Sequence, residues 1–253
     1  MSSVGTGYDL SAATFSPDGR IFQTEYALKA VDAAGTCIAL RGKDGTVFAV
    51  EKLIKTKLYL PTTNRRLRNV DTHIGFAFTG MYPDAHALAE FCIEEAQDYF
   101  RQYRTKIPCQ HLADRLSLYM HAYTLYGALR PFGCSVFLSS WSEIEGPQLF
   151  MIEPSGVMYG YRGWAIGKGR QAAKTEIEKL KLEELTVKEL IKEAARIIYA
   201  VRDETKDRNL VLEMSWVSKD TKGKHEMLPP DLLAETEAWA KEKVSEVEGD
   251  EEH

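Results

Sequence analysis

The side chains in this sequence that are best suited to chemistry are its four cysteines and six histidines. Cys134 lies in the segment Gly133-Cys134-Ser135 beside an apolar run. A nucleophilic cysteine would need a nearby histidine and an electropositive pocket, and His111 and His121 are the candidates for that partner. A free cysteine in an apolar run also packs as a small hydrophobic residue. We therefore expect Cys134 to be buried in a strand rather than to act as a nucleophile.

The spacing of these residues argues against a metal site. The cysteines stand at positions 37, 92, 109 and 134, with no C-x-x-C pair, and are too sparse for a disulfide framework. The histidines form no i, i+4 pair, so we expect them at the surface or at helix ends. The sequence therefore predicts free thiols, a reducing compartment and no bound metal.

Glycine-containing segments give no cofactor motif. Gly160-Tyr-Arg-Gly163 and Gly167-Lys-Gly169 lack the spacing of dinucleotide-binding and phosphate-binding loops, which favours turns or close packing. The chain also lacks the G-x-S-x-G, H-E-x-x-H and EF-hand patterns. We expect no cofactor.

Composition excludes several classes of protein. The chain has 253 residues and a formal net charge of −5, and residues 245–253 hold five acids without a lysine or arginine. The remaining residues carry 32 charges of each sign, so nothing indicates a nucleic-acid partner. No apolar run is long enough to span a membrane, and the first residues lack the features of a signal peptide.

The elements that must position any site follow from hydrophobic periodicity and turn residues. Ser16-Pro17-Asp18-Gly19 predicts a turn, and Thr186 with Glu189 predicts a capping box. The predicted strands are 36–41, 46–51, 74–79, 135–138, 149–152, 157–161 and 210–217. The predicted helices are 21–31, 82–99, 112–123, 169–182, 187–201 and 230–239.

Strands joined by hairpins and helices grouped in pairs argue against a doubly wound parallel sheet. They predict an α+β fold in which two antiparallel sheets pack together and helices cover them. We expect one domain with three parts: a tail and turn at 1–19, the αββα body at 20–241, and a disordered acidic tail at 242–253.

One stretch of sequence is specific to a known family. Tyr8-Asp9 and the segment Phe15–Ala30 resemble the N-terminal signature of proteasome alpha-type subunits, and the resemblance continues along essentially the whole chain. Arg130-Pro-Phe-Gly133 and Gln171-Ala-Ala-Lys174 resemble two further blocks of the family. The resemblance implies the four-layer αββα sandwich of the N-terminal-nucleophile hydrolases, in agreement with the predicted elements.

The resemblance also bears on catalysis. The related beta-type subunits attack with an N-terminal threonine whose own amine is the base, assisted by an acid and a lysine. Their pattern places Gly35 at the threonine, Glu51 at the acid and Arg66 at the lysine. Gly35 has no nucleophile, Arg66 does not give up its proton, and Thr36 has an internal amide. The resemblance thus implies no catalytic residue, and we expect Glu51 and Arg66 to form an ion pair.

The family's alpha-type subunits form a ring whose N-terminal tails block an axial pore. The resemblance assigns Tyr8, Asp9, Pro17 and Tyr26 to a cluster that holds the tails open. Without the family, Tyr26 would be read as an inward-packing helix residue and Tyr8 as part of a disordered tail. Leu10 replaces the arginine of the usual Tyr-Asp-Arg triplet, which removes one salt bridge between subunits.

A second site implied by the family is a groove that receives the C-terminal peptides of regulatory particles. Lys57 matches the lysine that would pair with the incoming carboxylate, and Gly80 matches the pocket wall. Pattern alone would make Lys57 a solvated lysine, as we expect for Lys52 and Lys55.

The resemblance therefore implies a noncatalytic alpha-ring subunit of the 20S core in the cytoplasm and nucleus. The implied roles are ring assembly, gating and cap docking for ubiquitin-dependent and ubiquitin-independent degradation. The implied partners are other alpha-type and beta-type subunits, regulatory caps and unfolded substrates. Two alternatives stay open: a self-standing hydrolase using Thr36 or Ser2, and an adaptor recognised through its acidic tail, where Ser245 is a candidate phosphorylation site.

Overall fold

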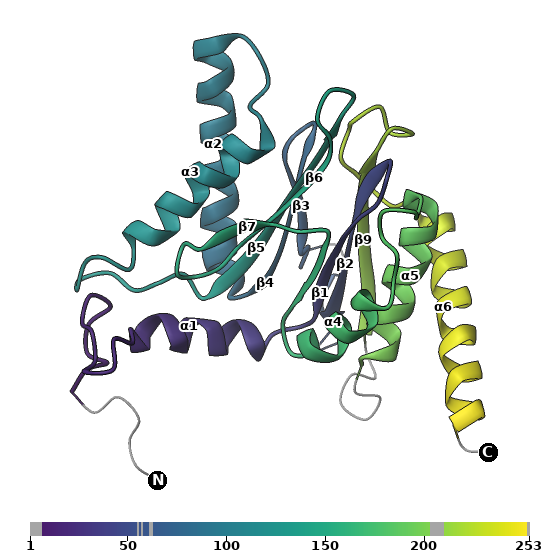
Figure 1. The fold of residues 1–253 in the computed structure, drawn as a ribbon, viewed down its shortest axis with the longest axis horizontal. Helices are drawn as coiled ribbons and strands as arrows, with labels where there is room; N and C mark the ends of the chain where they lie inside the picture. Colours follow the sequence, from purple (N-terminus) through teal and green to yellow (C-terminus); the bar gives the residue numbers. More distant parts are fainter. Residues whose placement is uncertain (1–6, 55, 57, 61–62, 203–209, 252–253) are drawn as a thin grey trace.

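Two five-stranded antiparallel sheets lie between helices in this chain (Figure 1). A computed structural model describes residues 7–54, 56, 58–60, 63–202 and 210–251. The first sheet has the order β10-β9-β2-β1-β8, formed by β1 (Cys37–Arg41), β2 (Gly45–Leu53), β8 (Gly163–Ile166), β9 (Leu210–Ser218) and β10 (Glu226–Met227). The second has the order β3-β4-β5-β6-β7, formed by β3 (Leu67–Asp71), β4 (Ile74–Gly80), β5 (Cys134–Ser142), β6 (Gly146–Ile152) and β7 (Met158–Gly160).

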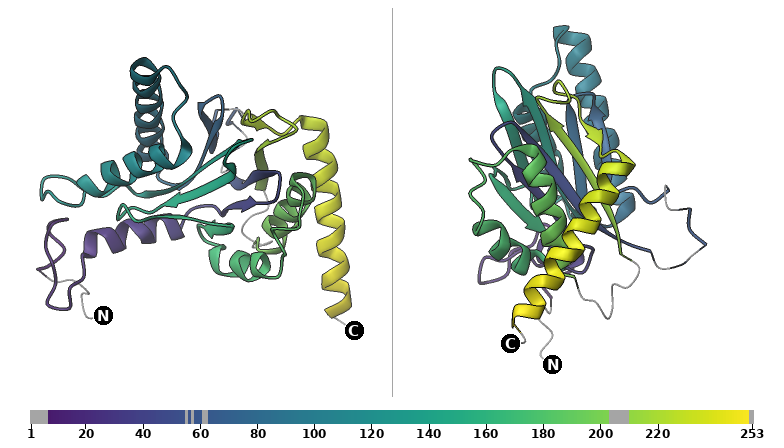
Figure 2. Two further views of the ribbon diagram at one scale, coloured as in Figure 1. Left: turned by 45° about the horizontal axis from the view of Figure 1, so that its top comes forward. Right: turned by 90° about the vertical axis from the view of Figure 1, so that its right-hand side faces the viewer.

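The helices in the described part of the chain form the outer layers and one end of the molecule. They are α1 (Phe22–Asp32), α2 (Tyr82–Tyr103), α3 (Cys109–Ala122), α4 (Arg170–Glu178), α5 (Val187–Ala200) and α6 (Pro230–Glu251). Helices α2 and α3 pack against the second sheet, and α4 and α5 pack against the first, with α6 outside α5 (Figures 1 and 2). The expected four-layer αββα arrangement is confirmed.

The core follows from the two-residue period of the strands. In β1, Ile38 and Leu40 point toward α5, whereas Cys37 and Ala39 point between the sheets. The layer between the sheets includes Phe48 and Phe137, whose ring centroids lie 6.2 Å apart. Each strand of the central pairs therefore contributes to two hydrophobic layers.

Most predicted elements are confirmed near their expected bounds. The hairpin β1–β2 turns at Lys43 and Asp44, with the Gly42 amide donating to the Gly45 carbonyl at 2.9 Å. The capping box is present: the Thr186 amide donates to Glu189 at 2.7 Å, and the Glu189 amide donates to the Thr186 hydroxyl at 3.4 Å. All four cysteines are free and buried, as expected for Cys134.

Three strands are absent from the sequence prediction. Strand β3 reads Leu-Arg-Asn-Val-Asp and buries Leu67 and Val70 without strict alternation. Strands β8 and β10 have four and two residues, too short for a periodic signal. Sheet pairing in three dimensions, rather than local pattern, defines these strands.

The prediction that residues 242–253 form a disordered tail is wrong for residues 242–251, because α6 continues to Glu251. Glutamate and lysine in this region have high helix propensity, and Lys243 pairs with Glu246 one turn later, with Nζ and Oε2 2.6 Å apart. None of the helices in the described residues is long and apolar enough to cross a membrane.

Candidate functional site

The N-terminal turn is built from the predicted residues. The Gly19 amide donates to the Ser16 carbonyl at 2.9 Å, and Gly19 has a φ of +74°, which glycine adopts without strain. The Arg20 amide donates to the Ser16 hydroxyl at 3.0 Å, so the segment closes on itself. Pro17 is exposed at the tip of this turn.

Asp9 and Tyr26, two of the four predicted gating residues, are in contact. The Tyr26 hydroxyl donates to Oδ2 of Asp9 at 3.2 Å, and Nε2 of Gln23 donates to the Asp9 carbonyl oxygen at 2.5 Å. Burial raises the pKa of Tyr26, and the hydrogen bond with Asp9 raises it further. The phenol therefore stays protonated and able to donate.

Tyr8 and Leu10 flank this contact with exposed side chains, 42% and 87% accessible. Tyr8, Pro17 and Leu10 thus present exposed aromatic, rigid and apolar surface at the N-terminal end of the described chain. Such groups can stack and pack against another surface, while Asp9 and Tyr26 hold the backbone between them. The geometry is that of a segment anchored to α1 through Asp9.

Next to the position where the family pattern would place a nucleophile, hydrogen bonds hold the backbone and the side chain of Thr36. The internal amide of Thr36 donates to Oε2 of Glu51 at 2.8 Å, and the Gly169 amide donates to the Thr36 hydroxyl at 3.1 Å. The second oxygen of Glu51 lies 2.7 Å from Nζ of Lys168. Thr36 and Glu51 are both buried.

Gly35 itself has no room for a side chain. A Cβ built there would lie 2.4 Å from the carbonyl oxygen of Glu51, which belongs to the neighbouring backbone and cannot move aside cheaply. The Thr79 hydroxyl donates to the Gly35 carbonyl at 2.5 Å and fixes this approach. No residue with a nucleophilic side chain fits at position 35 in this structure.

The expected ion pair between Glu51 and Arg66 is wrong. Glu51 pairs with Lys168 instead, whereas the Arg66 guanidinium donates to the Gly80 carbonyl at 3.3 Å and lies 5.3 Å from the centroid of the Phe78 ring. The Arg66 amide donates to the carboxylate of Glu213 at 2.8 Å. Glu51 and Arg66 therefore belong to two separate polar groups.

Lys52 and His225 are also buried, contrary to expectation. Lys52 is 4% exposed, and burial lowers its pKa while the Glu213 carboxylate opposes that shift. His225 is 2% exposed and bridges Asn69 and Ser215, with Nδ1 2.6 Å from the Asn69 amide oxygen and Nε2 2.8 Å from the Ser215 hydroxyl. The residues that flank Lys52 and His225 in the sequence form no pattern that predicts burial.

The predicted docking pocket is only partly described. Lys57 lies outside the described residues, as does Lys55. Gly80 ends β4 with a φ of +116°, and a Cβ there would lie 2.3 Å from the Gly133 carbonyl oxygen. Close packing against β5 is therefore sufficient to require glycine at position 80.

The Arg-Pro-Phe-Gly segment has a partner that the sequence did not reveal. Asp84, at the start of α2, accepts two hydrogen bonds from the Arg130 guanidinium at 2.6 and 2.8 Å and one from the Gly133 amide at 2.8 Å. The Arg130 guanidinium lowers the pKa of Asp84. These bonds fix the loop between α3 and β5 to the body.

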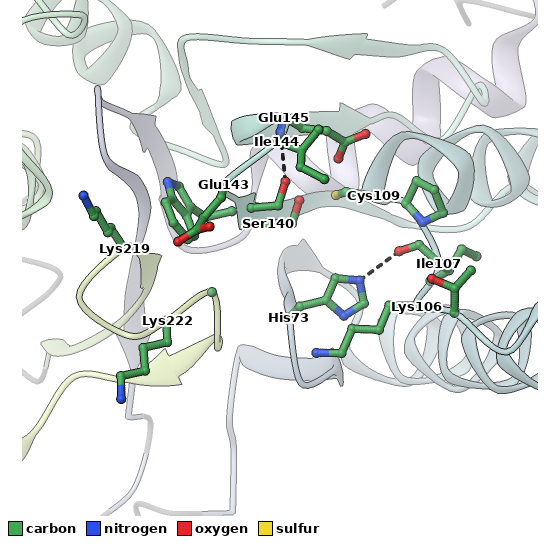
Figure 3. A pocket seen from close by; sticks show the side chains of 15 residues that line it. His73, Lys106, Ile107, Cys109, Ser140, Glu143, Ile144, Glu145, Lys219 and Lys222 are labelled. Carbon is green, nitrogen blue, oxygen red and sulfur yellow. Dashed lines mark hydrogen bonds between the residues drawn. The ribbon is translucent and has the colours of Figure 1, made fainter.

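A cavity of about 630 Å³ lies between the β3–β4 turn, the α2–α3 loop, the β5–β6 turn and the segment after β9 (Figure 3). His73 and Lys106 line one side and Lys219 and Lys222 the other, with Glu143 between them. Lys106 already donates to the Thr72 hydroxyl at 2.9 Å, and the charges are of both signs. Among the described residues, no group of histidines, cysteines and carboxylates could hold a metal ion.

Comparisons with known proteins point to the same family along nearly the whole chain. The family described as "Proteasome subunit" matches residues 31–217, and the N-terminal signature of the A-type proteasome subunits matches residues 8–30. A proteasome alpha type-3 subunit from Acanthamoeba castellanii is 54% identical over 246 residues, 97% of each chain. The protein of that name from Spinacia oleracea is 52% identical over 250 residues, 99% of this chain and 100% of the relative. A probable proteasome alpha type-7 subunit from Saccharomyces cerevisiae is 46% identical over 249 residues, 97% of this chain and 86% of the relative.

Proposed function

The chain belongs to the proteasome alpha-type subunits, and on this premise we propose that it is a noncatalytic member of the alpha ring of the 20S core particle. It resembles the type-3 subunit, whose name several relatives carry. The segments that resemble this subunit are Gly7–Ala12, His121–Tyr126, Lys174–Leu180 and the acidic end. In this role the chain shapes a compartment in which other subunits cleave substrate.

The packing at Gly35 carries the noncatalytic assignment. A nucleophile at this position would need a side chain and a free amine, whereas Gly35 lies against the Glu51 carbonyl and Thr36 donates its internal amide to Glu51. Lys168 holds the Glu51 carboxylate in place. The acid that would assist catalysis therefore has a structural function.

Tail contacts support a role in gating. We assign Tyr8, Asp9, Pro17 and Tyr26 to a cluster that holds the tail clear of the pore when a regulatory particle is bound. The Tyr26–Asp9 hydrogen bond and the Ser16–Gly19 turn support this assignment, since both fix the base of the tail. A regulator that binds this arrangement better than the closed one shifts the population toward the open gate.

The remaining roles follow from the same membership. The chain assembles with other alpha-type subunits and with beta-type subunits into stacked rings. Regulatory caps dock their C-terminal peptides beside Lys57 and Gly80, and unfolded substrates pass the pore in ubiquitin-dependent and ubiquitin-independent degradation. We propose that the subunit acts in the cytoplasm and nucleus.

Native mass spectrometry with intact-mass analysis of the subunit tests this proposal. A ring subunit runs in a hetero-oligomer of stacked rings and retains residues of the 8–30 signature at its N-terminus. A self-standing hydrolase would have a mature chain that begins near residue 36, and a free adaptor would run as a monomer. Either result would reject the proposal.

A further inference from the structure

The tail contacts a second part of the body, separate from α1. A Cβ built at Gly127 would lie 2.9 Å from the Ser11 hydroxyl and 3.7 Å from the Ser11 Cβ. Gly127 belongs to the loop between α3 and β5, and this loop lies beside the tail in Figure 1 and in the left view of Figure 2. Ser11 thus occupies space that any side chain at position 127 would fill.

Ser11 is held in this position by its own turn. Its hydroxyl accepts a hydrogen bond from the Ala13 amide at 3.2 Å, and its carbonyl oxygen accepts one from the Thr14 amide at 3.5 Å. Ala12, the next residue, is 2% exposed. A larger residue at position 127 would therefore have to break the hydrogen bond of the Ser11 hydroxyl or shift the backbone next to the buried Ala12.

The loop that contacts Ser11 is itself rigidly connected. The Thr124 amide donates to the His121 carbonyl at 2.9 Å, and the Leu129 amide donates to the Tyr126 carbonyl at 3.1 Å across Gly127. The next residue is Arg130, which forms the two hydrogen bonds to Asp84. The loop therefore connects the base of the tail to the start of α2.

We infer that Gly127 is a positioning residue for the N-terminal tail, and that the loop 123–130 fixes where the tail leaves the body. The inference rests on the gating role proposed above. Two contacts define the tail in this arrangement: Asp9 is hydrogen-bonded to Tyr26 and Gln23 of α1, and Ser11 lies against Gly127 of the loop. A side chain at position 127 displaces Ser11 and disfavours the arrangement in which Asp9 meets Tyr26.

The test uses assembled 20S cores that carry Gly127→Val in this subunit. Hydrolysis of a fluorogenic peptide is measured with and without a synthetic C-terminal peptide of a regulatory particle. Gly160→Val is the matched control, because a Cβ at Gly160 in β7 has no neighbour closer than 3.6 Å and valine suits a strand. A second pair of cores carries the same substitutions in a subunit that lacks residues 1–12.

We expect Gly127→Val to reduce the stimulation by the peptide about threefold or more and Gly160→Val to leave it unchanged. In cores with the shortened subunit, Gly127→Val and Gly160→Val should give the same rate of hydrolysis, since no tail remains to be positioned. Unchanged stimulation with Gly127→Val overturns the inference. A loss of rate caused by Gly127→Val that is as large in the shortened cores as in the full-length cores also overturns it. If shortening does not raise the unstimulated rate, the gating role itself is rejected.

Discussion

At the residue scale, Gly35 shows how one absent side chain separates this subunit from an enzyme. The fixed backbone of Glu51 fills the space that a nucleophile at position 35 would need. The sequence alone shows that the residue is glycine, but not why. The reason is a contact across 16 residues of chain, which requires the β1–β2 hairpin to be in place.

Tyr26→Phe removes the hydroxyl that donates to Asp9 and keeps the ring. We expect assembled cores with this substitution to lose about threefold of their stimulation by a regulatory C-terminal peptide, because one hydrogen bond of the proposed open arrangement is lost. Fluorogenic peptide hydrolysis measures the effect. Tyr159→Phe, at an exposed tyrosine of β7, is the control. Equal stimulation in the two variants would remove Tyr26 from the gate.

His225 should make the stability of the chain depend on pH. Burial lowers its pKa from 6.5 to about 4, so the unfolded chain binds a proton in a range where the folded chain does not. Stability is therefore fully present above pH 6.5 and falls as the pH drops toward 4. The loss from this group is about 3.5 kcal/mol at most, since each unit of pKa shift corresponds to about 1.4 kcal/mol.

Urea unfolding of the purified chain at pH 7, 6 and 5 measures this dependence. His225→Gln lacks the titrating ring, so its free energy of unfolding should fall less steeply between pH 7 and pH 5. Its free energy of unfolding at pH 7 should be lower than that of the original chain. His86→Gln, at an exposed histidine of α2, should keep the slope of the original chain. Parallel curves for the His225 variant and the original chain would show that His225 does not remain neutral in the fold.

At the element scale, the capping box of α5 allows a sharp test. Thr186→Ala removes the hydroxyl that accepts from the Glu189 amide and should cost about 1 kcal/mol of stability. Thr175→Ala is the matched control, because Thr175 is exposed inside α4, where alanine is the better helix former. Urea unfolding distinguishes them. A Thr186 variant as stable as the Thr175 variant would mean that the cap contributes nothing.

The elements that the sequence predicts well are those with a long hydrophobic period or clear end signals. Helix α5 has both, and the β1–β2 hairpin has its turn residues. Strand β3 could not be predicted, because its polar residues find partners far away in the sequence: Arg68 contacts Glu90 of α2, and Asn69 contacts His225 before β10. The end of α6 differs from the prediction because its acidic residues, which are typical of solvated coil, also have the helix propensity to continue the last helix.

At the scale of the whole molecule, the layers bring residues together that the sequence separates. The turn at 16–19 and the residues of the Asp9–Tyr26 contact were predicted, the latter through family resemblance. The links from Asp84 to Arg130 and from Ser11 to Gly127 were not, because each joins elements from different parts of the chain. Burial of Lys52 likewise depends on β9 beside β2.

The most direct test of the account is peptide hydrolysis by assembled 20S cores in which Thr36 of this subunit is replaced by valine. Valine keeps the buried shape and removes the hydroxyl of the residue that follows Gly35 in the chain. A noncatalytic subunit predicts that cores with this substitution, compared at equal amounts of assembled particle, hydrolyse every fluorogenic substrate at the rate of the original cores. Selective loss of one cleavage specificity in fully assembled particles would contradict the account.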